Sequence, residues 1–247
     1  LVLWRLDEPE DGAIEIQGYG DPIAIGQDYV PIPIQATSSP ASVSAEGRFG
    51  RGRALADLVA RSDFGSFEPG LSSFTLQCWF KTRPVGRTYM LVGRSGVDGH
   101  AHEFGIHLFP SGLLRAFLID TAHNNWQVDV PARLYDASSS VWRTCVVDDE
   151  QWHLLTMVVD RASDQLMLYV DQELRASAPA PTGFGALRNS NLRFRAGLKN
   201  IWSGGIAAFP DADQFPGVLD EVRLISGVRT SEEIRADFGL PTSSPED

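Results

Sequence analysis

Apolar and polar residues alternate over several long runs from about Phe74 onward, and this alternation restricts the possible folds more than any other feature of the sequence. An alternation with a period of two indicates a strand that buries one face. The runs cover residues 74–81, 89–92, 103–109, 113–119, 154–159, 166–170 and 192–197, and turn-forming residues such as those at 110–112 and 160–164 separate them. A succession of half-buried strands predicts an all-β fold of two packed antiparallel sheets rather than alternating strands and helices.

One segment, residues 231–238, has the features of a helix. Thr230 and Glu233 have the spacing of a capping box, in which each residue satisfies a backbone amide of the other. Gly239 and Pro241 provide a stop signal. A helix this short covers an edge of a sandwich and does not build a core.

The chain has 247 residues, 43% of them hydrophobic, which is enough for one well-packed core. We expect a single domain over residues 1–240, with residues 241–247 as a flexible tail or tether. No apolar run approaches the ~18 residues of a membrane helix. The net charge of -11 opposes binding to a phosphate backbone or an anionic membrane, so we expect neither a nucleic-acid partner nor membrane insertion.

Four segments, in this order along the chain, are similar to those of a known family. They are residues 1–8 (LVLWRLDE), 74–81 (FTLQCWFK), 151–155 (QWHLL) with 168–171 (LYVD), and 215–225 (FPGVLDEVRLI). Together they resemble the laminin G-like (LamG) jellyroll modules of the concanavalin A-like lectin/glucanase superfamily. The resemblance implies a two-sheet antiparallel jellyroll sandwich with one short C-terminal helix.

Asp220 requires a specific explanation because strand alternation places it on the same side as Val222 and Leu224. A charged carboxylate there is costly unless a cation or several donors meet it, so Asp220 is either a rim residue in water or a partner to a positive group. Members of the resembled family often hold a calcium ion between the first and last strands. The resemblance places Asp7 and Asp220 at the matching positions and implies a structural calcium site.

Loops rich in aromatic and amide residues are the expected place for ligand recognition. A sugar stacks its apolar face on a flat ring, while its hydroxyls bond to amides and carboxylates. The loops at residues 123–126, 135–142 and 200–205 have this composition, and within them we select Asn125, Trp126 and Trp202 as ligand-binding residues. The alternative is that each tryptophan only closes an open end of the sandwich.

Catalytic signatures are missing from the sequence. It contains no P-loop, no zinc-protease motif, no nucleophile elbow and no alternating acid run of the kind retaining glycosidases use. His100 and His102 alternate before Glu103, but a polar loop explains them equally well. Cys78 and Cys145 are expected as buried free thiols, with a disulfide as the alternative for an exported protein.

These features favour a non-catalytic binding or adhesion module that recognises a glycan or a protein surface through rim loops. We expect it to form part of a larger extracellular, cell-surface or virion-surface protein, in a multidomain or multi-subunit assembly. The alternative is a structural domain that decorates an assembly without a soluble ligand, for which Arg193 and Arg195 on an exposed strand would suit a protein partner. A polysaccharide hydrolase or lyase with unfamiliar acids is the third possibility.

Overall fold

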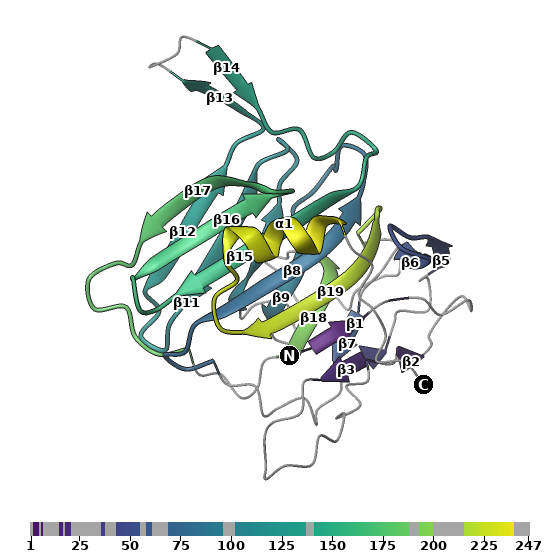
Figure 1. Cartoon of the computed structure of the whole chain (residues 1–247). Coiled ribbons are helices and arrows are strands. Elements are labelled where there is room, and N and C mark those ends of the chain that lie inside the picture. The colour runs from purple at the N-terminus through teal and green to yellow at the C-terminus, as the bar shows by residue number, and fades with distance from the viewer. Residues whose placement is uncertain are drawn as a thin grey trace.

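The computed structural model describes residues 2–4, 6, 15–16, 18–20, 36–37, 43–54, 58–60, 69–95, 102–136, 141–187, 193–199 and 215–239. These residues form two antiparallel sheets packed face to face, with one helix (Figure 1). The expected all-β jellyroll sandwich is therefore confirmed. The boundary at residue 240 and the tail lie outside the described residues and stay predictions.

The first sheet contains the long strands of the two halves of the chain. Its strands run in the order β17 (Glu173–Pro179), β16 (Gln165–Val170), β15 (His153–Asp160), β8 (Phe74–Lys81), β19 (Val218–Ser226), β1 (Val2–Trp4) and β3 (Gly18–Gly20); β6 (Arg51–Ala54) also pairs with β19 and with β5 (Val43–Glu46). β1 lies antiparallel beside β19, with Leu3 opposite Arg223 and Trp4 opposite Val222. The first and last described strands are thus neighbours, as the family resemblance implies.

The second sheet lies against the first and completes the sandwich (Figure 1). Its order is β12 (Asn125–Val130), β11 (Leu114–Ile119), β10 (His102–Leu108), β9 (Tyr89–Ser95), β18 (Arg193–Lys199), β7 (Leu58–Ala60), β4 (Ala36–Thr37) and β2 (Glu15–Ile16). Tight turns join β10 to β11 and β15 to β16 at the positions that the sequence predicts.

Strand β8 shows how the alternating pattern becomes a core. Phe74, Leu76, Cys78 and Phe80 belong to the main hydrophobic cluster between the sheets. Trp79, the residue between Cys78 and Phe80, lies on the opposite face of the same strand. Burial of alternate residues is what a strand with one inward face requires. Cys78 and Cys145 are both buried and both free, so the prediction of buried thiols is confirmed.

The helix α1 (Ser231–Gly239) covers the outer face of the first sheet (Figure 1). Its buried residue Ile234 packs in a small cluster with Val158 and Tyr169. The capping box is present, because Glu233 N donates to Thr230 Oγ1 at 3.2 Å and Thr230 N donates to Glu233 Oε2 at 2.8 Å. Within the described residues, no helix is long and apolar enough to cross a membrane.

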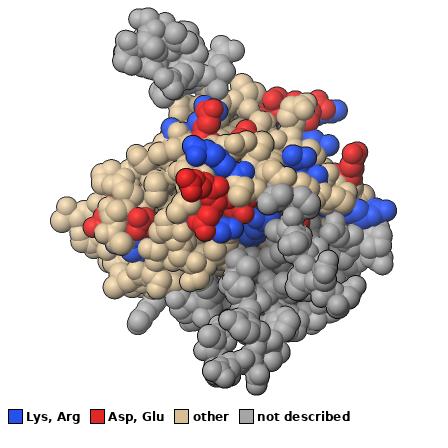
Figure 2. All heavy atoms as spheres, in the orientation of Figure 1, with Lys and Arg blue, Asp and Glu red and all other residues tan. Residues whose placement is uncertain are grey.

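A small hairpin stands apart from both large sheets. β13 (Arg133–Asp136) and β14 (Val141–Thr144) pair only with each other and project beyond the end of the sandwich (Figure 1). On the face that carries α1, the described acidic and basic residues are interspersed rather than gathered into a patch of one sign (Figure 2).

Candidate functional site

The turn between β11 and β12 is the most highly organised exposed loop in the described structure. Asp120, 4% exposed, accepts hydrogen bonds at Oδ1 from the backbone amides of Ala122 (2.9 Å) and Asn124 (2.8 Å). Its Oδ2 accepts from Asn124 Nδ2 at 2.8 Å and from Gly185 N at 2.7 Å. One carboxylate thus holds four donors from two loops. Burial acts to raise the pKa of Asp120, but the donors together lower it below its usual value.

The residues that Asp120 orders are themselves open to solvent. All of residues 121–125 are exposed, and His123 adopts the left-handed conformation with φ of 65°. Asn125 Nδ2 donates to Gln127 Oε1 at 2.8 Å, so the amide of Asn125 is oriented at the start of β12. The turn therefore presents hydroxyl, imidazole and amide groups on a backbone with little freedom to lose on binding.

Trp126 does not serve as a ligand-binding ring, and this expectation is corrected. Its ring is 1% exposed, and its Nε1 donates to the backbone oxygen of Ala178 at 3.1 Å. Strand alternation explains the difference, because Trp126 lies inward with Val128 while Asn125 and Gln127 lie outward. The alternative stated from the sequence, that the tryptophan closes an end of the sandwich, fits its position.

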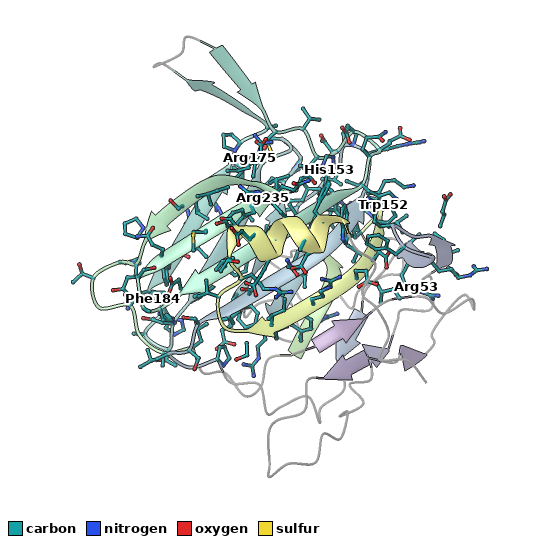
Figure 3. The ribbon with its side chains drawn as sticks, viewed as in Figure 1. Arg53, Trp152, His153, Arg175, Phe184 and Arg235 are labelled. Atoms are coloured by element: carbon teal, nitrogen blue, oxygen red, sulfur yellow. The ribbon has the colours of Figure 1, made fainter. Side chains whose placement is uncertain are left out.

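Phe184 is the ring that the sequence reasoning missed. It lies half-buried at the rim, in the loop that carries Gly185 (Figure 3), with its centroid 5.3 Å from that of Trp126. The guanidinium of Arg161 lies 4.9 Å from the same ring and donates to Gly185 O at 3.2 Å. Trp126 and Arg161 thus support an aromatic ring beside the turn of residues 121–125. The glycines on both sides of Phe184, at 183 and 185, are the only local sign of a shaped loop.

Asp220 occupies a second, buried cluster on the outer side of the first sheet. It is opposite Trp79, whose ring packs 5.1 Å from that of Phe238 in α1. The expectation that Asp220 shares the face of Val222 and Leu224 is wrong, because the register shifts between Asp220 and Arg223 and Glu221 adopts a φ of 47°. This bulge adds a residue and moves Asp220 to the other face.

The partners of Asp220 are backbone amides rather than a cation. Arg48 N and Phe49 N donate to Oδ2 at 2.7 and 3.0 Å, and the amide of Glu221 donates to Oδ1 at 2.8 Å. Burial, with repulsion from Glu221, outweighs these bonds and raises the pKa of Asp220 to about 8. The result is a clamp that fixes the turn at residues 47–50 to β19.

This donor set does not fit a calcium ion. Calcium requires six to eight oxygen ligands at about 2.3–2.6 Å, whereas both oxygens of Asp220 already accept hydrogen bonds from N–H groups. In the part of the chain that the structure describes, no group of three or more His, Cys, Asp and Glu residues could hold a metal. Asp7, the predicted second ligand, lies outside the described residues, as do Trp202 and His100.

The comparisons with known proteins place this geometry in a family. A laminin G family model, described as the concanavalin A-like lectin/glucanases superfamily, matches residues 56–235 of the 247-residue chain. The chain belongs to this superfamily. A comparison with curated protein sequences gave no significant match.

Solved structures similar to this superfamily member are toxin binding domains. The binding domain of Paraclostridial Mosquitocidal Protein 1 is 14% identical, with a TM-score of 0.63 over 89% of this chain and 51% of its own. The ligand binding domain of Botulinum neurotoxin serotype D, solved with N-acetylneuraminic acid, is 9% identical, with a TM-score of 0.58 over 89% and 49%. The serotype G binding domain is 12% identical, with a TM-score of 0.59 over 96% and 50%. This chain therefore spans about half the length of those domains, and the likeness establishes the fold.

In this concanavalin A-like domain, two further acidic or basic residues from the sequence analysis have structural partners. Glu103 is 2% exposed and forms a buried ion pair with Arg94 at 3.0 Å, so its carboxylate is not offered to a metal beside His102. Arg195 is 4% exposed. The expectation that it lies on an exposed strand is therefore wrong.

Proposed function

We propose that this domain is a non-catalytic glycan-binding module whose site is the rim formed by residues 121–125 and Phe184. The observation that supports the proposal most is the exposed turn held by Asp120 beside a half-buried aromatic ring. The amides of Asn124 and Asn125 would bond to sugar hydroxyls, and the ring of Phe184 would take the apolar face of a pyranose.

Pre-organisation is the physical reason to prefer this rim to other loops. Ordering a loop on binding costs free energy that a loop already fixed by hydrogen bonds does not lose. The four donors on Asp120 and the contacts of Arg161 fix both sides of the rim. Similarity to toxin binding domains, one of them solved with N-acetylneuraminic acid, is consistent with a glycan ligand.

The wider setting belongs to the same proposal. The similar binding domains are about twice as long as the matched region, which is consistent with a module that works within a larger protein. We propose an extracellular, cell-surface or virion-surface protein as the parent. The absence of known catalytic motifs from the sequence supports a binding role rather than a hydrolase or lyase.

A glycan array followed by calorimetry tests the proposal. Asn125→Ala and Phe184→Ala should each weaken binding of a glycan found on the array by about tenfold, the loss of one good contact. The control is Leu174→Ala, which shortens an apolar side chain that is 49% exposed on β17. Silence on the array together with a stable oligomer would instead favour a scaffold domain, and hydrolysis of a polysaccharide panel would revive an enzyme.

Calcium is kept as a separate proposal, since Asp7 lies outside the described residues and the amide partners of Asp220 do not favour it. An ion bound only by the folded chain raises the melting temperature in proportion to its binding. Melting with excess calcium and with excess chelator decides the matter. Equal midpoints would end the calcium proposal without touching the rim site.

A further inference from the structure

The hairpin β13–β14 is the element of the described structure least explained by packing. It forms a two-stranded sheet of its own, and its ribbon projects away from the sandwich (Figure 1). An isolated two-stranded hairpin is at best marginally stable in water, because it has little apolar surface to bury. A hairpin kept in such a position suggests a role in contact with something outside the domain.

The base of this hairpin is firmly anchored. Cys145 N, directly after β14, donates to Ala132 O, directly before β13, at 2.9 Å. The flanking residues Val130 and Val147 are buried in the main core. The hairpin is therefore presented by a fixed base rather than by a loose loop.

The segment that leaves the hairpin is held by a second set of contacts. The ring of His153 (Figure 3) lies between two carboxylates, with Nδ1 at 3.1 Å from Asp171 Oδ2 and Nε2 at 3.1 Å from Asp149 Oδ1. Glu150 N donates to Thr82 O at 2.9 Å. Asp149 and Glu150 lie a few residues after β14, so these bonds fix the exit from the hairpin to β8 and β16.

The register divides the hairpin residues into two unlike faces. Residues directly opposite in an antiparallel pair share a face, and faces alternate along each strand. Arg133 pairs with Thr144 and Tyr135 pairs with Trp142, so these four positions form one face. The other face holds the pairs of Leu134 with Arg143 and Asp136 with Val141. Only the first face combines two aromatic residues with an arginine and no acid.

We propose that the face of Arg133, Tyr135, Trp142 and Thr144 is a second binding site, which takes a carboxylate-bearing sugar. Aromatic residues suit the apolar face of a pyranose, and a guanidinium pairs with a carboxylate through two parallel hydrogen bonds. A hydroxyl at Thr144 adds a donor and acceptor for sugar hydroxyls. The absence of an acid from this face removes the repulsion that an anionic sugar would meet beside Asp136.

The size of the hairpin favours a sugar over a macromolecular surface. Four residues of strand extend about 13 Å, at roughly 3.3 Å per residue. A stable protein interface buries about 800 Å² on each partner, more than one face of four residues provides. Between the strands, residues 137–140 read Ala-Ser-Ser-Ser, a polar composition unsuited to insertion into lipid. The site goes beyond the proposed rim site, and shares with it only the class of ligand.

Calorimetry with 3′-sialyllactose, and with lactose as the probe that lacks the carboxylate, tests this inference. Arg133→Gln should weaken sialyllactose binding by about tenfold or more, since a charge-assisted hydrogen bond is lost. Arg143→Gln, the matched change on the opposite face, should leave binding within about twofold. Trp142→Ala should weaken binding of both sugars, whereas Val141→Ala on the other face should not.

The outcomes separate this inference from the proposed function. Equal losses in Arg133→Gln and Arg143→Gln, or no loss in either, overturn the hairpin site. Glycan binding that depends on Phe184 but not on Arg133 or Trp142 leaves the rim proposal standing and ends this one. A wild-type domain that binds no glycan at all overturns both. Trp142→Tyr, which keeps an aromatic ring, should retain binding and guards against loss through misfolding of the hairpin.

Discussion

Asp120 and Asp220 perform the same task in two regions of the molecule, yet their environments drive their pKa values in opposite directions. Each buried carboxylate ties down an exposed turn by accepting backbone amides. Asp120 receives four donors and its pKa is lowered, while Asp220, 0% exposed and adjacent to Glu221, has its pKa raised to about 8. A hydrogen-bonded carboxylate therefore stabilises a loop in either case, but only Asp120 gains from being charged.

The largest expected effect concerns the pH dependence of stability around Asp220. Its pKa rises from 3.8 in the unfolded chain to about 8 in the folded one, so the folded state binds the extra proton between these values. Stability is then greatest at low pH and falls as the pH rises toward 8, by up to about 1.4 kcal/mol per pH unit. Asp220→Asn should remove this decline, as measured by urea unfolding between pH 5 and pH 8 with chelator.

Other groups that titrate in the same range, such as His153, are present in both proteins and cancel in the difference between them. The experiment contradicts the assignment if the two stability profiles run parallel. In that case Asp220 is charged throughout, and the two aspartates do not differ in the way described.

The next effect sharpens the comparison at Asp120. Asp120→Ala leaves the donors of Ala122, Asn124 and Gly185 without their acceptor, which should lower the free energy of unfolding by about 2 kcal/mol at pH 7. Asp160→Ala is the control, because Asp160 also caps a turn but its hydrogen bonds are exposed. It should cost about 0.5 kcal/mol. Equal losses from denaturant unfolding would mean that burial does not distinguish the two turns.

A third prediction uses the glycines beside the two aspartates. A Cβ on Gly47 would lie 2.2 Å from Arg51 O and 2.8 Å from Asp220 Oδ2, so backbone must move. A Cβ on Gly185 would lie 3.3 Å from Asp120 Oδ2, a distance that a small shift relieves. Gly47→Ala should therefore cost about 2 kcal/mol and Gly185→Ala under about 0.5 kcal/mol.

Gly86→Ala is the reference for that pair, since nothing lies within 4 Å of its added Cβ. Thermal unfolding of the three variants ranks them directly. Should Gly185→Ala prove as damaging as Gly47→Ala, the turn of residues 121–125 is packed more tightly than its contacts indicate.

The comparison also explains what sequence reasoning could and could not predict. Alternation gave the strands of both sheets and the inward side of β8, because the period of two follows directly from backbone geometry. The capping box at Thr230 and Glu233 is equally local. Asp220 was placed on the wrong face because one bulge at Glu221 reverses the alternation, and single residues with positive φ leave little trace in a sequence.

The rim site was only half predictable for a related reason. Asn125 was selected correctly as an exposed residue, but its neighbour Trp126 turned inward as strand alternation requires. Phe184 and Gly185 come from a loop about 60 residues further along the chain, and only the pairing of distant loops through Asp120 brings them to the turn. Such contacts depend on the assembled sandwich rather than on any local pattern.

The smallest expected effect is the acid limb of Asp120, and it completes the contrast. Because its folded pKa is lowered, Asp120 contributes stability above its unfolded value of 3.8, and that contribution is lost as the pH falls through the folded value. Urea unfolding between pH 4.5 and pH 2.5 should show the wild type losing stability relative to Asp120→Asn. Over the same range Asp220→Asn should keep a constant offset, since Asp220 already holds its proton in the folded state. An offset that changes for Asp220→Asn but not for Asp120→Asn would mean that the roles of the two carboxylates are exchanged.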